Sequence, residues 1–111
     1  IRALIVLGTT ATILLVSWVL WSSQADPYVK ATLNLQGSKD KGELLFRMNC
    51  VGCHGVAAQG LLGPSLAEVV NHHNDKEIIN QIVKGKTPPM PRFDIEPEAM
   101  ADLIEYLHSI N

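Results

Sequence analysis

The chain has 111 residues, with nine Lys and Arg against eleven Asp and Glu and a formal net charge of −2 when histidines are neutral. Apart from Arg2, all of these charges lie in residues 26–111, which are therefore net acidic and do not form a generally basic nucleic-acid-binding domain. The chain has two cysteines in total, too few for a structural zinc site built from two cysteine pairs.

The first candidate element is an apolar segment at the N-terminus. Ala3 to Trp21 is a run of nineteen residues without a charge, close to the length that a helix needs to cross a bilayer. Arg2 precedes it, and Trp18 and Trp21 stand where aromatic side chains meet the membrane surface. Ser23-Gln24-Ala25 would suit signal peptidase, but the run exceeds the 7 to 15 residues usual for a signal peptide. We predict an uncleaved transmembrane anchor over residues 1–25.

Residues 26–38 follow the anchor as a linker that is too short to form a domain. They are polar with scattered apolar side chains, so they act either as a tether or as a segment that docks on the domain after it. Whether the anchor is retained or cleaved, the remaining domain, residues 39–111, is carried to the far side of the membrane. Arg2, in the short segment before the apolar run, agrees with the positive-inside rule. We expect a single-pass membrane protein.

Cys50, Val51, Gly52, Cys53 and His54 form the pattern Cys-x-x-Cys-His, the signature of covalent c-type haem attachment. The two thiols are three positions apart near the end of a helical turn, so that each can add to one vinyl group of the porphyrin. The adjacent imidazole then reaches the iron from one face. We predict one haem c as cofactor, bonded through both cysteines, with His54 as a metal ligand.

Other cysteine sites suit this stretch less well. A thioredoxin-like redox pair opens a helix within a βαβ pattern, and this sequence has no strand-like alternation. A disulfide across so short a loop would leave the following histidine unexplained.

A methionine is the expected second axial ligand, because His/Met ligation makes the iron six-coordinate, raises its potential and suits electron transfer. Met48 is too close to Cys50 to reach the opposite face, and Met100 lies in an apolar periodic run typical of core. Met90 stands within Thr87–Pro91, whose prolines stiffen the loop and so lower the entropy cost of holding a thioether in place. The alternative is a proline-rich surface turn with an incidental methionine. We expect the rival histidines to be solvated, two in a polar loop and one near the C-terminus: His72, His73 and His108.

The domain is predicted to be helical throughout. We expect a first helix over Asp40 to Met48 and a second over Asp75 to Lys84, which Asn74 and Glu77 begin as a capping box and Gly85 ends. A third begins near Pro97 and has one apolar face, made of Met100, Leu103, Ile104 and Leu107. About 73 residues give only a marginal hydrophobic core, which a bonded haem would staple.

The block from about Gly42 to Ile110 resembles a class I monohaem cytochrome c. The resemblance is carried by four motifs in this order: Cys50-Val51-Gly52-Cys53-His54, Gly63-Pro64-Ser65-Leu66, the Pro-Pro-Met-Pro loop, and a last amphipathic helix containing Tyr106-Leu107. It implies an all-α class I fold wrapped around a covalent haem, with Pro64 and Leu66 at the cofactor.

The same resemblance implies two contacts. The carbonyl of Pro64 should accept the proton on the second ring nitrogen of His54, and Gly42 and Phe46 should cross the last helix near Leu103 and Tyr106. With its N-terminal span, Asp26-Pro27-Tyr28 and Leu35-Gln36-Gly37, the whole chain is more narrowly similar to the membrane-anchored cytochromes c-M of cyanobacteria.

Filled axial positions and the lack of any acid, base or nucleophile constellation predict a one-electron carrier and not an enzyme, with no small-molecule substrate. The resemblance implies redox protein complexes as partners in photosynthesis or respiration, between a cytochrome complex and a terminal oxidase or photosystem, on the periplasmic or thylakoid-lumenal side. Two alternatives are a permanent haem subunit of a larger membrane oxidoreductase and a ligand-sensing or peroxidatic haem domain with an open sixth site.

Overall fold

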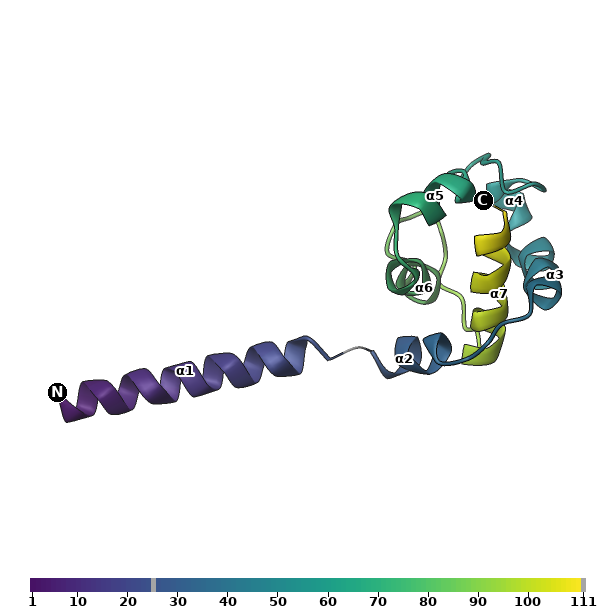
Figure 1. Ribbon diagram of the computed structural model, residues 1–111. Helices are drawn as coiled ribbons and strands as arrows, with labels where there is room; N and C mark the ends of the chain where they lie inside the picture. The colour runs from purple at the N-terminus through teal and green to yellow at the C-terminus, as the bar shows by residue number, and fades with distance from the viewer. Residues whose placement is uncertain (25, 111) are drawn as a thin grey trace.

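The computed structural model describes residues 1–24 and 26–110, over which the chain forms helices and no strand. One long helix stands apart from six shorter ones that pack together (Figure 1). In chain order the helices are α1 (Arg2–Ser22), α2 (Pro27–Leu33), α3 (Lys39–Asn49), α4 (Val51–His54), α5 (Leu66–His72), α6 (Asp75–Lys84) and α7 (Pro97–Ser109). The all-α prediction is confirmed over this part of the chain. Ala25, which belongs to the predicted anchor and to its candidate cleavage site, lies outside it.

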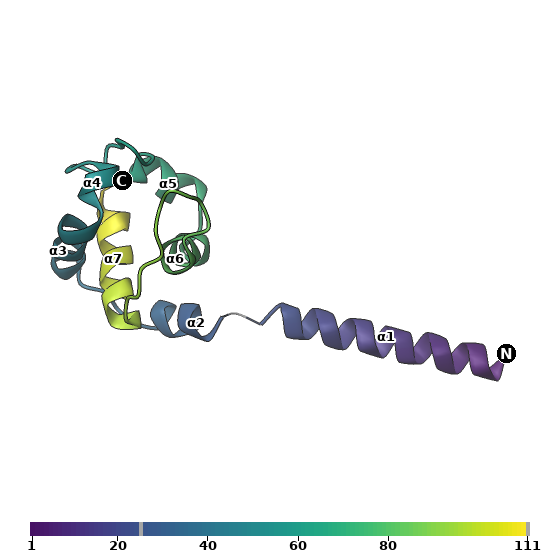
Figure 2. The ribbon, with the colours of Figure 1, turned by 180° about the vertical axis from the view of Figure 1, so that it is seen from behind.

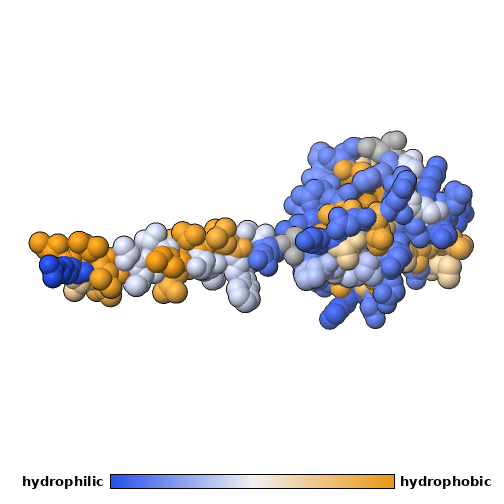
Figure 3. All heavy atoms as spheres, turned by 60° about the horizontal axis from the view of Figure 1, so that its bottom comes forward, coloured by the Kyte–Doolittle hydropathy of each residue, from blue (hydrophilic) through white to orange (hydrophobic). Residues whose placement is uncertain are grey.

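Helix α1 is the one described helix long and apolar enough to cross a membrane, and none of it is buried against the rest of the chain. Apolar side chains run along its length (Figure 3). Its threonine hydroxyls donate to carbonyls within the same helix, as from Thr9 to Val6 at 2.9 Å and from Thr12 to Gly8 at 2.8 Å. Polar groups satisfied inside the helix suit a lipid environment. A signal sequence meets the same criteria of length and composition.

The largest helix contact joins α3 and α7, which lie side by side in both views of the ribbon (Figures 1 and 2). Gly42 allows this approach, because a Cβ at that position would overlap the backbone carbonyl of Asp102 and lie 2.8 Å from the Cβ of Tyr106. One turn later, the fully buried Phe46 places its ring 5.2 Å from that of Tyr106, centroid to centroid. Leu103 is 2% exposed, and the predicted crossing is confirmed.

Helix α6 has the predicted bounds at both ends. The side chain of Asn74 accepts a hydrogen bond from the backbone N–H of Glu77 at 3.0 Å, and the Glu77 carboxylate accepts one from the backbone N–H of Asn74 at 3.0 Å. Gly85 ends the helix at φ 56° and ψ 46°, the left-handed conformation that glycine adopts without a steric penalty. The helix buries Ile78, Ile79 and Ile82, which lie together on one face.

Two short helices were not predicted. The sequence indicates a linker where α2 forms and a loop where α5 forms. Each of these helices is only seven residues long and depends on tertiary packing more than on its own propensity, so the sequence carries little signal for it. The prediction that His72 and His73 lie in a polar loop is wrong for His72. His72 is the last residue of α5, and His73 follows as its C-cap.

The segment after α1 docks on the domain, which decides between the two roles predicted for the linker. Val29 and Thr32 of α2 are each 1% exposed, and α2 packs against α7 and α6. The hydroxyl of Tyr28 donates a hydrogen bond to the carbonyl of Ile95 at 2.6 Å. Burial raises the pKa of this hydroxyl, so it remains a donor at neutral pH.

Asp26 fixes the start of α2 against the end of α6. Its carboxylate accepts a hydrogen bond from the backbone N–H of Tyr28 at 2.9 Å and lies 3.3 Å from Nζ of Lys84. The Tyr28 N–H, and then Lys84, lower the pKa of Asp26 against the opposing effect of desolvation. A depressed carboxyl pKa in the folded state stabilises the fold at neutral pH, and this stabilisation is lost as the pH falls through that pKa.

Replacing Gly42 by alanine tests the close approach of α3 and α7. We expect Gly42→Ala to lower the free energy of unfolding by about 1 to 3 kcal/mol, the usual cost of overpacking, since its Cβ meets backbone that cannot rotate away. Guanidinium unfolding of the full chain in mild detergent measures this. Gly8→Ala is the matched control, because a Cβ there meets nothing within 4 Å. Equal midpoints for the two variants would contradict the packing described.

Candidate functional site

The Cys-x-x-Cys-His pattern occupies its own helical turn. Cys50 is both the C-cap of α3 and the N-cap of α4, so the two helices are separated at the first cysteine and not fused into one. The carbonyl of Cys50 accepts hydrogen bonds from the backbone N–H of Cys53 at 3.2 Å and of His54 at 2.9 Å. One turn of helix therefore holds both thiols and the imidazole in a fixed relation.

The two thiols differ in environment. Cys53 is exposed, whereas Cys50 is partly buried. Burial raises the pKa of the Cys50 thiol to about 11, with a smaller contribution from Cys53, so the sulfur is uncharged at neutral pH. The described residues contain no group of three or more Cys, His, Asp or Glu that could hold a metal ion, so nothing in that part of the chain completes the four ligands of a structural zinc site. A sulfur packed against apolar side chains fits a covalent thioether bond to haem.

His54 is 8% exposed, and its Nδ1 lies 3.0 Å from the carbonyl oxygen of Pro64. Because a carbonyl can only accept, Nδ1 carries the proton and Nε2 keeps its lone pair. The contact that the resemblance implied is therefore present. Gly63 makes room for it, since a Cβ at that position would lie 2.7 Å from Cε1 and 2.9 Å from Nδ1 of the His54 ring.

Three backbone hydrogen bonds shape the loop from Gly55 to Ser65, and two of them return it to α4. The N–H of Gly60 donates to His54 at 2.8 Å, that of Gly63 donates to Cys53 at 2.7 Å, and that of Leu66 donates to Ala58 at 3.0 Å. These bonds place the Pro64 carbonyl beside the imidazole. The side chain of Leu66 is partly buried against the hydrophobic core.

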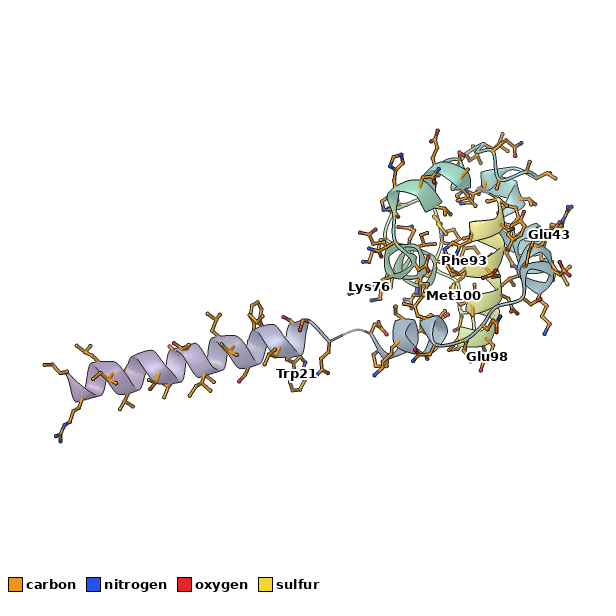
Figure 4. All side chains as sticks on the ribbon, viewed as in Figure 1. Trp21, Glu43, Lys76, Phe93, Glu98 and Met100 are labelled. Carbon is orange, nitrogen blue, oxygen red and sulfur yellow. The ribbon has the colours of Figure 1, made fainter. Side chains whose placement is uncertain are left out.

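The three methionines have three different environments. Met100 of α7 is fully buried, as predicted, and Met48 of α3 is 72% exposed. Met90 is partly buried against the core and lies in the loop between α6 and α7. Figure 4 labels Met100 on α7 and Phe93 in the loop that carries Met90.

The Met90 loop is fastened to the last turn of α6. The N–H of Met90 donates to the carbonyl of Thr87 at 3.2 Å, and the N–H of Phe93 donates to the carbonyl of Ile82 at 3.0 Å. Carbonyls at a helix end lack partners within the helix. The N–H of Phe93, in the loop, serves as the partner of the Ile82 carbonyl. The backbone that carries the Met90 side chain is therefore bonded to its own loop before it and to α6 after it.

The structure brings the predicted site residues together in two groups. His54, Pro64 and the cysteines are linked by the hydrogen bonds around α4, whereas Cys50, Leu66 and Met90 pack against one hydrophobic cluster. The rival histidines are exposed, and two of them pair with carboxylates of α6, His73 with Glu77 at 3.3 Å and His108 with Asp75 at 2.7 Å.

Sequence reasoning missed two residues of this region. Gly63 was recognised as part of a motif but not as the space for the His54 ring. Gln81 donates a hydrogen bond to the sulfur of Met90. It lies at the edge of the apolar face of α6, between Ile78 and Glu77, where a polar residue is ordinary and gives no sequence signal.

Known proteins are similar to this chain in sequence and in fold. The sequence model of the family described as cytochrome C oxidase, cbb3-type, subunit III matches residues 37–107. The "Cytochrome c-553-like" protein of Synechocystis sp. (strain ATCC 27184 / PCC 6803 / Kazusa) is 47% identical over 77% of this chain and 81% of its own length. The "Cbb3-type cytochrome c oxidase subunit FixP" of Bradyrhizobium diazoefficiens is 30% identical over 63% of this chain, which spans only 27% of that protein.

Among solved structures, cytochrome cL from Hyphomicrobium denitrificans matches with a TM-score of 0.58 at 29% identity. The match covers 78% of this chain and 53% of that one. The chain therefore spans about half the length of its structural relative.

Replacing Gly63 tests the space for the imidazole. We expect Gly63→Ala to break the hydrogen bond between His54 and Pro64 and to lower the free energy of unfolding by about 1 to 3 kcal/mol, because the added Cβ meets the buried ring. Nitrogen NMR of the His54 side chain reports the Nδ1 proton, and guanidinium unfolding reports stability. Leu62→Ala, at a side chain that is 81% exposed, is the neighbouring control. An unchanged Nδ1 signal in Gly63→Ala would refute this account of the ring.

Proposed function

This chain belongs to the cytochrome c family, and on that basis we propose that it is a membrane-anchored one-electron carrier whose haem iron is held between His54 and Met90. The family relationship makes it an electron-transfer protein of the class I fold and not an enzyme. It carries one haem c, attached through Cys50 and Cys53. When bound, this group supplies a one-electron ferric/ferrous couple.

The fixed imidazole of His54 is the observation that carries the proposal. A ring that is 8% exposed and hydrogen-bonded through Nδ1 to Pro64 has one orientation and one tautomer, so that Nε2 is always the coordinating nitrogen. A carbonyl partner also increases the basicity of the imidazole. Pro64 and Leu66 complete this side, the first as hydrogen-bond acceptor and the second as apolar contact.

Met90 is the proposed second ligand because its environment differs from that of the other two methionines. The thioether of Met100 is enclosed in the core and that of Met48 is in solvent, whereas Met90 is partly buried in a loop held at both ends by α6. A His/Met pair leaves no position for a substrate. The chain then moves electrons and does no other chemistry.

Replacing Met90 tests the ligation. We expect the oxidised wild-type protein to show the weak near-infrared absorption of sulfur bonded to ferric iron and Met90→Ala to lack it. The variant should also bind carbon monoxide when reduced, because the sixth position is open, and its reduction potential should fall. Optical spectra and a redox titration measure all three.

Two controls keep this test specific. Met48→Ala changes an exposed side chain, and Met100→Leu keeps the core filled, so both should retain the absorption. Carbon monoxide binding by the reduced wild type at neutral pH would contradict the carrier and favour the ligand-sensing alternative.

We propose that residues 1–25 anchor the chain, that 26–38 connect the anchor, and that 39–111 form the haem domain on the periplasmic or thylakoid-lumenal side. The support is the unburied apolar α1 and the docking of α2, which ties the end of the anchor to the domain. Anchoring confines the search for partners to the membrane. Redox protein complexes of photosynthetic or respiratory membranes are the donor and acceptor that we propose.

The second candidate is a permanent haem subunit of a larger membrane oxidoreductase. The match to the cbb3-type subunit III family and the similarity to the FixP subunit favour it. Mild detergent solubilisation distinguishes the two. A carrier is recovered on its own, whereas a subunit is recovered in one assembly of fixed stoichiometry.

A protease site inserted between Ser22 and Asp26 tests the anchor. We expect the intact chain to stay in the membrane after an alkaline wash, and cleavage to release a soluble haem domain with an unchanged visible spectrum. The same chain with a scrambled protease site is the control. Finding the unwashed protein in the soluble fraction with its N-terminus already near Asp26 would show a cleaved signal peptide and refute the anchor.

A further inference from the structure

The sulfur of Met90 has a hydrogen-bond donor of its own. Nε2 of Gln81, on the last turn of α6, lies 3.5 Å from Sδ of Met90. This distance is within the range of a hydrogen bond to sulfur, which is a weak acceptor. Gln81 is partly buried, so water competes less with this bond than it would at the surface.

Thr87 holds the Gln81 amide in the orientation that the acceptor sulfur of Met90 favours. Its hydroxyl lies 3.0 Å from Oε1 of Gln81 and donates to it, so the amide oxygen faces Thr87 and the amide nitrogen faces Met90. An amide that is flipped would place Nε2 against the hydroxyl and Oε1 against the sulfur, two acceptors facing one another. The carbonyl of Thr87 also accepts from the N–H of Met90. Thr87 therefore fixes both the backbone and, through Gln81, the side chain of Met90.

A thioether sulfur has two lone pairs, so Met90 can offer one to iron while the other accepts from Gln81. We propose that Gln81, oriented by Thr87, is a positioning residue that raises the reduction potential of the haem. The proposal rests on Met90 as axial ligand. A donor on the sulfur withdraws electron density from it, which weakens its bond to ferric iron more than to ferrous iron. The reduced state is favoured as a result.

Helix α6 gives this arrangement its rigidity. The backbone carbonyl of Gln81 accepts from the N–H of Gly85 at 2.9 Å, within the left-handed cap of the helix. The next carbonyl, that of Ile82, holds Phe93 beyond the Met90 loop. Gln81 thus lies on a capped helix end to which the loop is hydrogen-bonded before and after Met90. The amide and the sulfur are therefore held at a fixed distance.

The test compares three variants of the full-length haem protein by redox titration and near-infrared absorption. Gln81→Leu removes the donor at similar side-chain volume. We expect its equilibrium constant for reduction to fall by a factor of about 3 to 10, which is about 28 to 59 mV for one electron, with the sulfur-to-iron absorption retained at a shifted energy. Thr87→Val keeps the donor but loses its orientation, so a smaller fall is expected. Gln36→Leu, at an exposed position away from the Met90 loop, should change neither quantity.

The outcomes are distinct. A potential and an absorption in Gln81→Leu equal to those of the wild type would overturn the assignment. Complete loss of the absorption in that variant would overturn it too, because Gln81 would then only hold the loop in place. A wild-type protein without the absorption would refute Met90 ligation itself, and with it this inference. A lowered potential with the absorption retained supports it.

Discussion

The hydrogen bond from His54 to the carbonyl of Pro64 is the contact on which the rest of the site depends. It fixes the tautomer and the direction of a buried imidazole, and so decides which nitrogen can bind iron. Its geometry requires a glycine at position 63 and a loop that returns to α4 through backbone hydrogen bonds. A short stretch of chain therefore positions the proposed axial histidine.

Helix α6 positions Met90, the proposed second ligand. Its C-terminal turn carries Gln81 and the carbonyl of Ile82, and the left-handed Gly85 ends it. The Met90 loop is hydrogen-bonded to the Gln81 side chain and to the Ile82 carbonyl. Asp26 adds a link from the segment after α1, since it pairs with Lys84 one residue before Gly85. The start of α2 and the loop that carries the proposed ligand thus meet at the same helix end.

Local signals in the sequence were sufficient where the structure is decided locally. The capping box at Asn74 and the glycine at 85 gave both ends of α6, and the apolar periodicity gave the core face of α7. The crossing of α3 and α7 at Gly42 came from family resemblance, because close approach of two helices leaves no local pattern. The seven-residue α2 and α5 were missed, since tertiary packing stabilises them. The contact between Gln81 and Met90 depends on the path of a loop, which spacing along the chain does not reveal.

The central claim is that the sulfur of Met90, and no other, lies over the haem. Proton NMR of the reduced full-length protein, labelled at its methionine methyl groups, tests it most directly, because the porphyrin ring current displaces the signal of a methyl held over its face. The account predicts one strongly shifted methyl among the three methionines, and that this signal disappears in Met90→Ala. Three unshifted methyl signals, or a shifted signal that belongs to Met48 or Met100, would contradict it.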